Sequence, residues 1–190
     1  MQASLRPALA ALAFCAANGA WAGIPTFCER TKEVSAADQD RVLRFAAVVK
    51  RELESSGAGV ALVARAGTDL SRFGLLYSHA AVALKHNPAS PWAVRQLYYA
   101  CDESRPRLFD QGVAGFALGA ETPASGHMSL VFLPEDDGAL LEKSALDKPL
   151  ALSLLAGQYS ANAYAFSTRY QNCNQWVAEL LASAWGRLDG

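Results

Sequence analysis

The stretch Tyr170–Trp176, YQNCNQW, opens the last clear helix of the chain and puts a cysteine in its first turn. From Asn172 to Trp185 apolar residues recur at three- and four-residue steps, which predicts a helix with one buried face. Asn172 is a good N-cap residue, so Cys173 falls where unpaired backbone N–H groups and the helix dipole favour a thiolate. A cysteine in this position becomes a nucleophile when a histidine comes close to it.

A histidine that can serve this cysteine stands in the segment Leu75–His86, LLYSHAAVALKH. With the run at 92–101, across a loop that contains two prolines, it predicts an antiparallel hairpin. Alternation along the first strand puts His79 on a face lined by small residues. A turn centred in the loop places Gln96 or Tyr98 opposite His79. The Gln96 amide can accept from the ring and fix its tautomer, or it can be an ordinary edge-strand polar group.

The rest of the chain predicts further helices and strands around this hairpin. Ser35 begins a capping box in which Asp38 replaces the usual glutamate, and this predicts a helix to about Ser55. The other predicted elements are a buried strand at 59–66, a loop and short helix at 104–119, a strand at 127–133, helices at 136–146 and 150–157, and a strand or extended segment at 159–170.

Composition bounds the class of protein. The chain has 190 residues, of which 52% are hydrophobic and 18% charged, which is typical of a globular domain with its own core. Basic and acidic residues nearly balance, at 17 and 18, and no block of Lys and Arg stands out. The sequence therefore predicts no nucleic-acid partner.

Residues 1–22 have the features of a cleaved signal peptide. Arg6 supplies the positive charge, 8–17 the apolar run, and Ala20–Ala22 the small-x-small site of cleavage after Ala22. The apolar run is too short for a membrane anchor, so none is expected after cleavage. We therefore expect a single domain at 23–190 that is periplasmic or secreted.

Cleavage also removes Cys15 and leaves an odd number of cysteines, Cys28, Cys101 and Cys173. In an oxidising compartment one pair can form in three ways, and the sequence does not choose among them. If Cys173 is a nucleophile, the remaining pair is Cys28–Cys101, a loop of about 70 residues that would contribute about 4 kcal/mol. Alternatively, all three cysteines are buried and unpaired.

No motif in the sequence predicts a metal or a cofactor. Neither C-x-x-C nor H-E-x-x-H occurs, and the phosphate loop, G-x-G-x-x-G and G-x-S-x-G are missing as well. His86, beside the hairpin loop, and His127, at a loop–strand junction, are expected to be solvated. The candidate chemistry is thus reduced to one cysteine at a helix start and one histidine at a strand start.

This arrangement resembles the circularly permuted branch of the NlpC-type, papain-like cysteine hydrolases, in which the histidine strand precedes the cysteine helix. More specifically, three segments are similar to a family of uncharacterised secreted bacterial proteins known only as a domain of unknown function. These segments are Arg65–Ser71 with Tyr77–Ala80, Trp92–Leu97, and Ser167–Trp176. The resemblance covers most of the chain from about Cys28 to Trp185.

The resemblance implies an α+β fold in which a curved antiparallel sheet packs against helices. It also implies that Cys173 is the nucleophile, His79 the base and Gln96 the orienting residue. Gln96 is a departure, because this position is commonly histidine in the family that the chain resembles.

Two functions follow as hypotheses. In the first, the protein hydrolyses or transfers an acyl group at an amide or ester, and backbone N–H groups with Gln171 or Tyr170 hold the oxyanion. Cell-wall peptide, that is peptidoglycan, or another small peptide or acyl compound is then the substrate that the superfamily implies. In the second, the fold is a non-catalytic binding or structural module, Cys173 is a buried thiol or disulfide partner, and His79 is a satisfied core residue.

Overall fold

The computed structural model describes residues 34–67, 70–119, 126–164, 166 and 168–186. Its elements follow in the order α1 (Ala36–Ser55), β1 (Val60–Arg65), the short 3-10 helix η2 (Ser71–Phe73), β2 (His79–Leu84), β3 (Ala93–Ala100), β4 (Arg105–Gln111), α2 (Val113–Leu118), β5 (Met128–Phe132), α3 (Glu135–Leu146), α4 (Lys148–Ser153) and α5 (Cys173–Gly186). The predicted α+β class is confirmed.

The first helix begins where the capping pattern predicts. The Ser35 hydroxyl oxygen accepts a hydrogen bond from the backbone N–H of Asp38 at 3.1 Å, so one of the unpaired amides of the first turn is satisfied. The helix then buries one stripe at helical spacing, made of Val42, Ala46, Val49 and Leu53.

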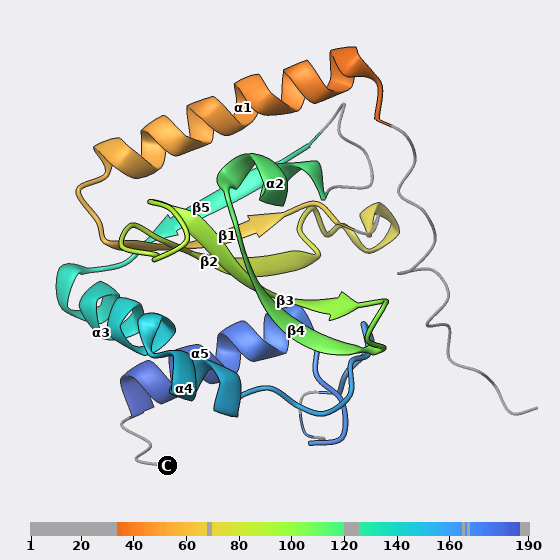
Figure 1. Cartoon of the computed structure of the whole chain (residues 1–190), viewed down its shortest axis with the longest axis vertical. Coiled ribbons are helices and arrows are strands. Elements are labelled where there is room, and N and C mark those ends of the chain that lie inside the picture. The colour runs from red at the N-terminus through yellow and green to blue at the C-terminus, as the bar shows by residue number, and fades with distance from the viewer. Residues whose placement is uncertain (1–33, 68–69, 120–125, 165, 167, 187–190) are drawn as a thin grey trace, which may run out of the picture.

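The strands form one five-stranded antiparallel sheet in the order β4-β3-β2-β1-β5 (Figure 1). The predicted hairpin is confirmed, since Val82 pairs with Arg95 and Leu84 with Ala93. The prediction of a loop before α2 is wrong, because most of that segment is β4. The strand was not predicted because it contains Pro106, a residue that disfavours strands. Pro106 pairs with Tyr99, and a proline without an N–H is tolerated there because β4 is an edge strand.

Helices cover both faces of the sheet (Figure 1). α1 and α2 pack on one face, and α3, α4 and α5 pack on the other. The strand β2 is consequently buried on both sides, and its residues from Ala81 to Leu84 have no exposed surface. Among the described residues, no helix is long and apolar enough to cross a membrane.

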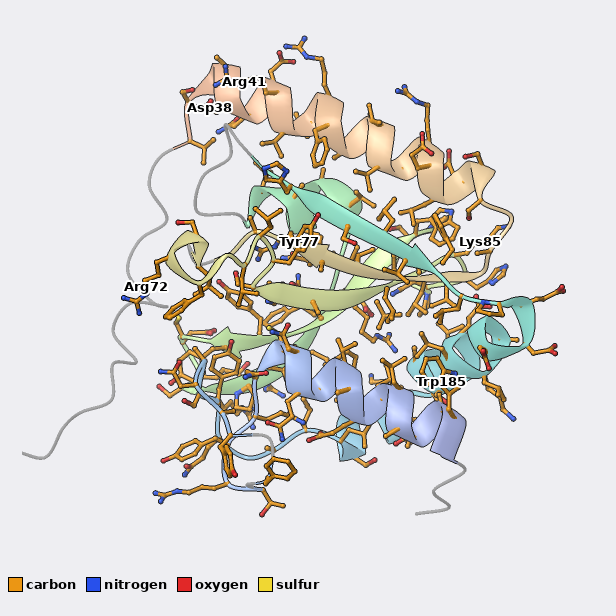
Figure 2. All side chains as sticks on the ribbon, turned by 180° about the vertical axis from the view of Figure 1, so that it is seen from behind. Asp38, Arg41, Arg72, Tyr77, Lys85 and Trp185 are labelled. Carbon is orange, nitrogen blue, oxygen red and sulfur yellow. The ribbon has the colours of Figure 1, made fainter. Side chains whose placement is uncertain are left out.

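The helix α5 lies along β2 and is fastened at both ends. At its start, the backbone N–H of Gln175 donates to Asn172 Oδ1 at 2.9 Å, which confirms the predicted N-cap. At its end, the indole N–H of Trp185 donates to the carbonyl of Asp137 in α3 at 3.2 Å (Figure 2). The segment 159–170 before it forms turns and, among its described residues, only the isolated bridge Tyr159–Gln171 rather than a strand.

Replacing the cap residue tests how α5 is held at its start. Asn172→Ala is expected to lower the free energy of unfolding by about 1 kcal/mol, because an amide of the first turn loses its acceptor. Asn172→Asp keeps that acceptor and is the matched control. Urea unfolding of the two variants and the parent chain measures the difference, and equal stability of all three would show that this cap does not hold the helix.

Candidate active site

Cys173 is a free thiol with 4% of its surface exposed, at the start of α5. Its Sγ lies 4.0 Å from the carbonyl oxygen of Ser78 and 3.6 Å from Asn174 Oδ1. Asn174 Oδ1 also accepts from the backbone N–H of Ala80 at 3.0 Å. These contacts fall on the two residues that flank His79, so the start of α5 is docked at the start of β2.

Figure 2 shows which end of the sheet this is. Tyr77 and Lys85 mark the two ends of the β2 segment, and Trp185 lies towards the Lys85 end. The first turn of α5 is therefore at the opposite end, beside Tyr77 and His79. The fold brings together two residues that stand 94 positions apart in the sequence, Ala80 and Asn174.

His79 is 6% exposed, and a chain of two glutamine side chains fixes its tautomer. Its Nε2 lies 2.6 Å from Gln96 Oε1, and Gln96 Nε2 donates to Gln111 Oε1 at 2.7 Å. Because the Gln96 NH₂ group is committed to Gln111, its carbonyl faces the imidazole and accepts from Nε2–H. Nδ1 is then the nitrogen that carries the lone pair. The predicted contact between His79 and Gln96 is therefore present.

Burial keeps the His79 ring neutral. Burial and, to a smaller extent, the nearby Arg65 charge lower the pKa of His79 to about 4, although the Gln96 hydrogen bond acts in the opposite direction. Two aromatic rings enclose the imidazole, since the Tyr98 ring centroid lies 5.9 Å from its centroid and that of Phe116 5.7 Å away. At neutral pH His79 is thus able to accept a proton.

Burial also decides the state of the Cys173 thiol. It raises the pKa of Cys173, and this effect outweighs the backbone amides of Ala80 and Asn174 and the charge of Arg65, which all lower it. The amides of the helix start do lower the thiol pKa, as the sequence predicts, but the net shift is upward because burial removes water from the sulfur. The resting pair is a neutral thiol and a neutral imidazole.

Tyr159 is the third polar group at the thiol. Burial, followed by the charge that Cys173 would carry, raises the pKa of Tyr159, so the phenol lies close to the thiol. Among the described residues no hydrogen bond joins Cys173 to His79 directly. The structure places both side chains near the start of β2, with Tyr159 close to the Cys173 side chain and Gln96 hydrogen-bonded to the His79 ring.

The two side chains predicted to hold an oxyanion have other surroundings. Gln171 is 1% exposed, and its Oε1 accepts from the backbone N–H of Ala156 at 3.1 Å. Its Nε2 donates to the Leu154 carbonyl at 2.7 Å and to the Glu179 carboxylate. This amide ties the preceding segment to α5. Tyr170 stacks under the Arg169 guanidinium at 5.0 Å, and its role stays a prediction.

The cysteine pairing is described in part. Cys173 is free, whereas Cys101 is disulfide-bonded. Cys28 lies outside the described residues, as does the predicted signal peptide, so the pair Cys28–Cys101 and the cleavage after Ala22 stay predictions.

His86 is solvated as predicted, with 66% of its side chain exposed, although it also pairs with Glu142 at 2.6 Å. No cluster of three or more metal-binding side chains occurs in the described part of the chain.

Arg65 and Gln111 were not predicted as site residues from the sequence. Arg65 ends β1 and pairs across the sheet with His79. A charged residue at the end of a buried apolar run was the available signal for it. Gln111 could not be found, because it stands in β4, whose existence was not predicted.

Residues 52–189 match the family described as "Uncharacterized protein conserved in bacteria (DUF2145)". The chain belongs to this family. The match includes the strand of His79, the strand of Gln96 and the helix of Cys173 in this DUF2145 protein. No curated protein and no solved structure matches the chain.

The low pKa of His79 in this DUF2145 protein predicts how its stability depends on pH. The unfolded chain takes up a proton near pH 6.5, whereas the folded chain resists it down to about pH 4. Stability is therefore complete above about pH 6.5 and falls as the pH drops towards 4, by up to about 3 kcal/mol from this group. His79→Gln is expected to remove that loss.

The measurement is the free energy of unfolding of the parent and His79→Gln chains at pH 4, 5, 6 and 7. The carboxylates titrate in both chains and cancel in the difference. A difference that stays constant from pH 7 to pH 4 would show that His79 is protonated in the folded protein.

Proposed function

We propose that the protein is a cysteine hydrolase that transfers an acyl group from an amide or ester, with Cys173 as nucleophile and His79 as general base. The observation that carries this proposal is the Gln111–Gln96–His79 hydrogen-bond chain. It holds the imidazole as the Nε2–H tautomer and leaves Nδ1 to accept a proton. A third residue that orients the base is the signature of nucleophilic catalysis by cysteine or serine.

The pKa shifts favour one order of events. With a neutral thiol and a neutral imidazole at rest, the proton leaves Sγ as the carbonyl is attacked rather than beforehand. The Sγ–C bond forms, the carbonyl electrons move to oxygen, and His79 receives the thiol proton. The oxyanion then collapses, the C–N or C–O bond breaks, and His79 returns the proton to the leaving group. Water hydrolyses the thioester by the same route in reverse.

The backbone is the source of oxyanion stabilisation that this proposal favours. The backbone N–H groups of Cys173 and Asn174, at the start of α5, lower the pKa of the thiol and are the oxyanion donors that this proposal favours, whereas the N–H of Ala80 is already bonded to Asn174 Oδ1. The Gln171 amide is committed to the Leu154 and Ala156 backbone. Tyr170 stays a candidate donor.

The substrate class that we propose is a peptide or acyl compound of the cell wall. It rests on the resemblance to NlpC-type hydrolases and on the predicted signal peptide, which would deliver the domain at 23–190 to the periplasm or the exterior. Neither a metal nor a cofactor has a part in the proposed reaction.

The experiment is the trapping of an acyl-enzyme. The chain from Gly23 onwards is mixed with p-nitrophenyl acetate, and we expect a burst of one equivalent of nitrophenol and an acetyl group on Cys173 by mass spectrometry. Cys173→Ala should abolish the burst. His79→Gln should slow it by about 10²- to 10⁴-fold, the usual contribution of a general base. His86→Gln, an exposed histidine changed in the same way, should behave as the parent.

One observation favours the alternative function, a non-catalytic binding or structural module. Burial of Cys173 to 4% exposure, with a raised thiol pKa, is also the state of an inert core cysteine. In that case the chain forms no acyl-enzyme, and iodoacetamide labels Cys173 slowly at a rate that His79→Gln does not change. This pair of results would exclude the hydrolase.

Changing the orienting residue gives a sharper test of the base. Gln96→Glu would put a carboxylate on His79 Nε2, where the amide oxygen now lies at 2.6 Å, and is expected to raise the pKa of His79 because an adjacent anion stabilises imidazolium. Nuclear magnetic resonance of the histidine ring against pH measures it, with Gln96→Leu as the uncharged variant. An unchanged His79 titration in Gln96→Glu would mean that this contact does not orient the ring.

A further inference from the structure

Arg65 is a buried cation with few partners. It is 5% exposed, at the end of the inner strand β1. Its Nη1 donates to the Ala66 carbonyl at 3.1 Å, and its Nε has no hydrogen-bond partner in the part of the chain that the structure describes. No aspartate or glutamate among the described residues forms an ion pair with it. Burial accordingly lowers the pKa of Arg65.

A second buried arginine shows what a structural role looks like in this fold. Arg95, 6% exposed, forms a two-pronged ion pair with Asp110, from Nε to Oδ1 at 2.8 Å and from Nη2 to Oδ2 at 2.7 Å. Its Nη1 donates to the Ala145 carbonyl at 2.5 Å. A buried charge costs several kcal/mol unless it is paired in about this way. Arg65 is buried as deeply, and no carboxylate of the described residues pairs with it.

The Arg65 guanidinium belongs to the candidate active site. It shares the Phe116 ring with His79, because its central carbon lies 5.2 Å from the ring centroid and the imidazole centroid 5.7 Å from it. Its charge acts on His79 and Cys173, and it is felt by Tyr159 as well. This cation, which forms no ion pair within the described part of the chain, therefore lies beside the proposed base and nucleophile.

Two glycines let the backbone lie close to the Arg65 guanidinium. A Cβ at Gly119 would lie 2.6 Å from Arg65 Nη2, and a Cβ at Gly67 would lie 3.4 Å from Nη1. Any larger residue at Gly119 would press on the fork of nitrogen atoms. The lack of a side chain at Gly119 is therefore what allows the guanidinium to take this position.

We infer that Arg65 binds a carboxylate of the substrate, so that the acyl compound on which Cys173 and His79 act is an anion with a carboxylate close to the scissile bond. The planar guanidinium fork matches a carboxylate with two parallel hydrogen bonds, as Arg95 does with Asp110. This inference rests on the proposed function, because it names the substrate class of the same site.

The test uses a matched pair of small probes, N-acetylglycine with a carboxylate beside an amide and N-acetylglycinamide without the charge. Each is titrated into the ¹⁵N-labelled chain from Gly23 onwards, and the Arg65 Nε–H signal and the Gly67 amide signal are followed. We expect N-acetylglycine to shift both signals and the neutral amide to shift neither. Arg65→Met should weaken the binding of N-acetylglycine at least about 10-fold, which is the usual worth of hydrogen bonds to a charged group.

Arg51→Met is the control for loss of one positive charge, since Arg51 is exposed on α1, and it should bind as the parent does. Equal binding of the two probes, binding of neither, or full affinity in Arg65→Met would each overturn the inference. Should Arg65→Met fail to fold, Arg65→Lys decides, because it keeps the charge and loses the fork and should bind N-acetylglycine more weakly than the parent.

The two proposals fail separately. If Cys173→Ala binds N-acetylglycine while the parent forms no acyl-enzyme, the carboxylate site stands and the hydrolase is excluded. If the acyl-enzyme forms but iodoacetate and iodoacetamide alkylate Cys173 with the same rate ratio in the parent and Arg65→Lys, the hydrolase stands and the role of Arg65 is excluded. A ratio that shifts towards iodoacetamide in Arg65→Lys supports the inference.

Discussion

The burial of β2 on both faces is the constraint from which the rest of the architecture follows. Ala81 and Ala83 face α1 and α2, whereas Val82 and Leu84 face α5 and its neighbours, and none of the four has exposed surface. The alanines let one helical layer approach closely, and the larger side chains fill the other core. Because helices cover both faces of this strand, the residues at its end are largely shielded from water. His79 begins that strand, so its environment is set by the packing of both layers.

Buried polar groups need hydrogen-bond partners inside the protein. The three buried polar side chains His79, Arg95 and Arg65 have partners of different chemical types. His79 is satisfied by an amide that a second amide orients, and this leaves one ring nitrogen without a proton. Arg95 is satisfied by a carboxylate and a carbonyl. Arg65 has one carbonyl and an aromatic face. In the first two arrangements the buried group has its hydrogen-bond partners within the protein. The third has no carboxylate among the described residues, and it lies beside the proposed base and nucleophile.

The elements that local patterns specify could be predicted from the sequence, and the effects of burial could not. The capped helix of Cys173, the hairpin of His79 and the contact with Gln96 follow from periodicity, turn chemistry and register. β4 was missed because an edge strand with a proline and alternating charges lacks the apolar signal of an inner strand. The helix start lowers the thiol pKa as predicted, but the larger upward effect of burial was not predicted, because a helix start shows in the sequence and desolvation does not. Arg65 was not predicted as a site residue, because no local pattern shows whether a buried arginine has a carboxylate partner.

The charge of Arg65 acts in opposite senses on the two groups of the proposed reaction. It lowers the pKa of Cys173, which favours a thiolate, and it lowers the pKa of His79, which disfavours the imidazolium that must form with it. Without a bound substrate, the effect on His79 adds to that of burial and keeps the pKa of the proposed base low. A substrate carboxylate on Arg65 would neutralise this charge, so His79 would become a stronger base at the moment when a carbonyl is at hand. The proposed site would then react slowly with neutral compounds. It would react faster with substrates whose carboxylate forms an ion pair with Arg65.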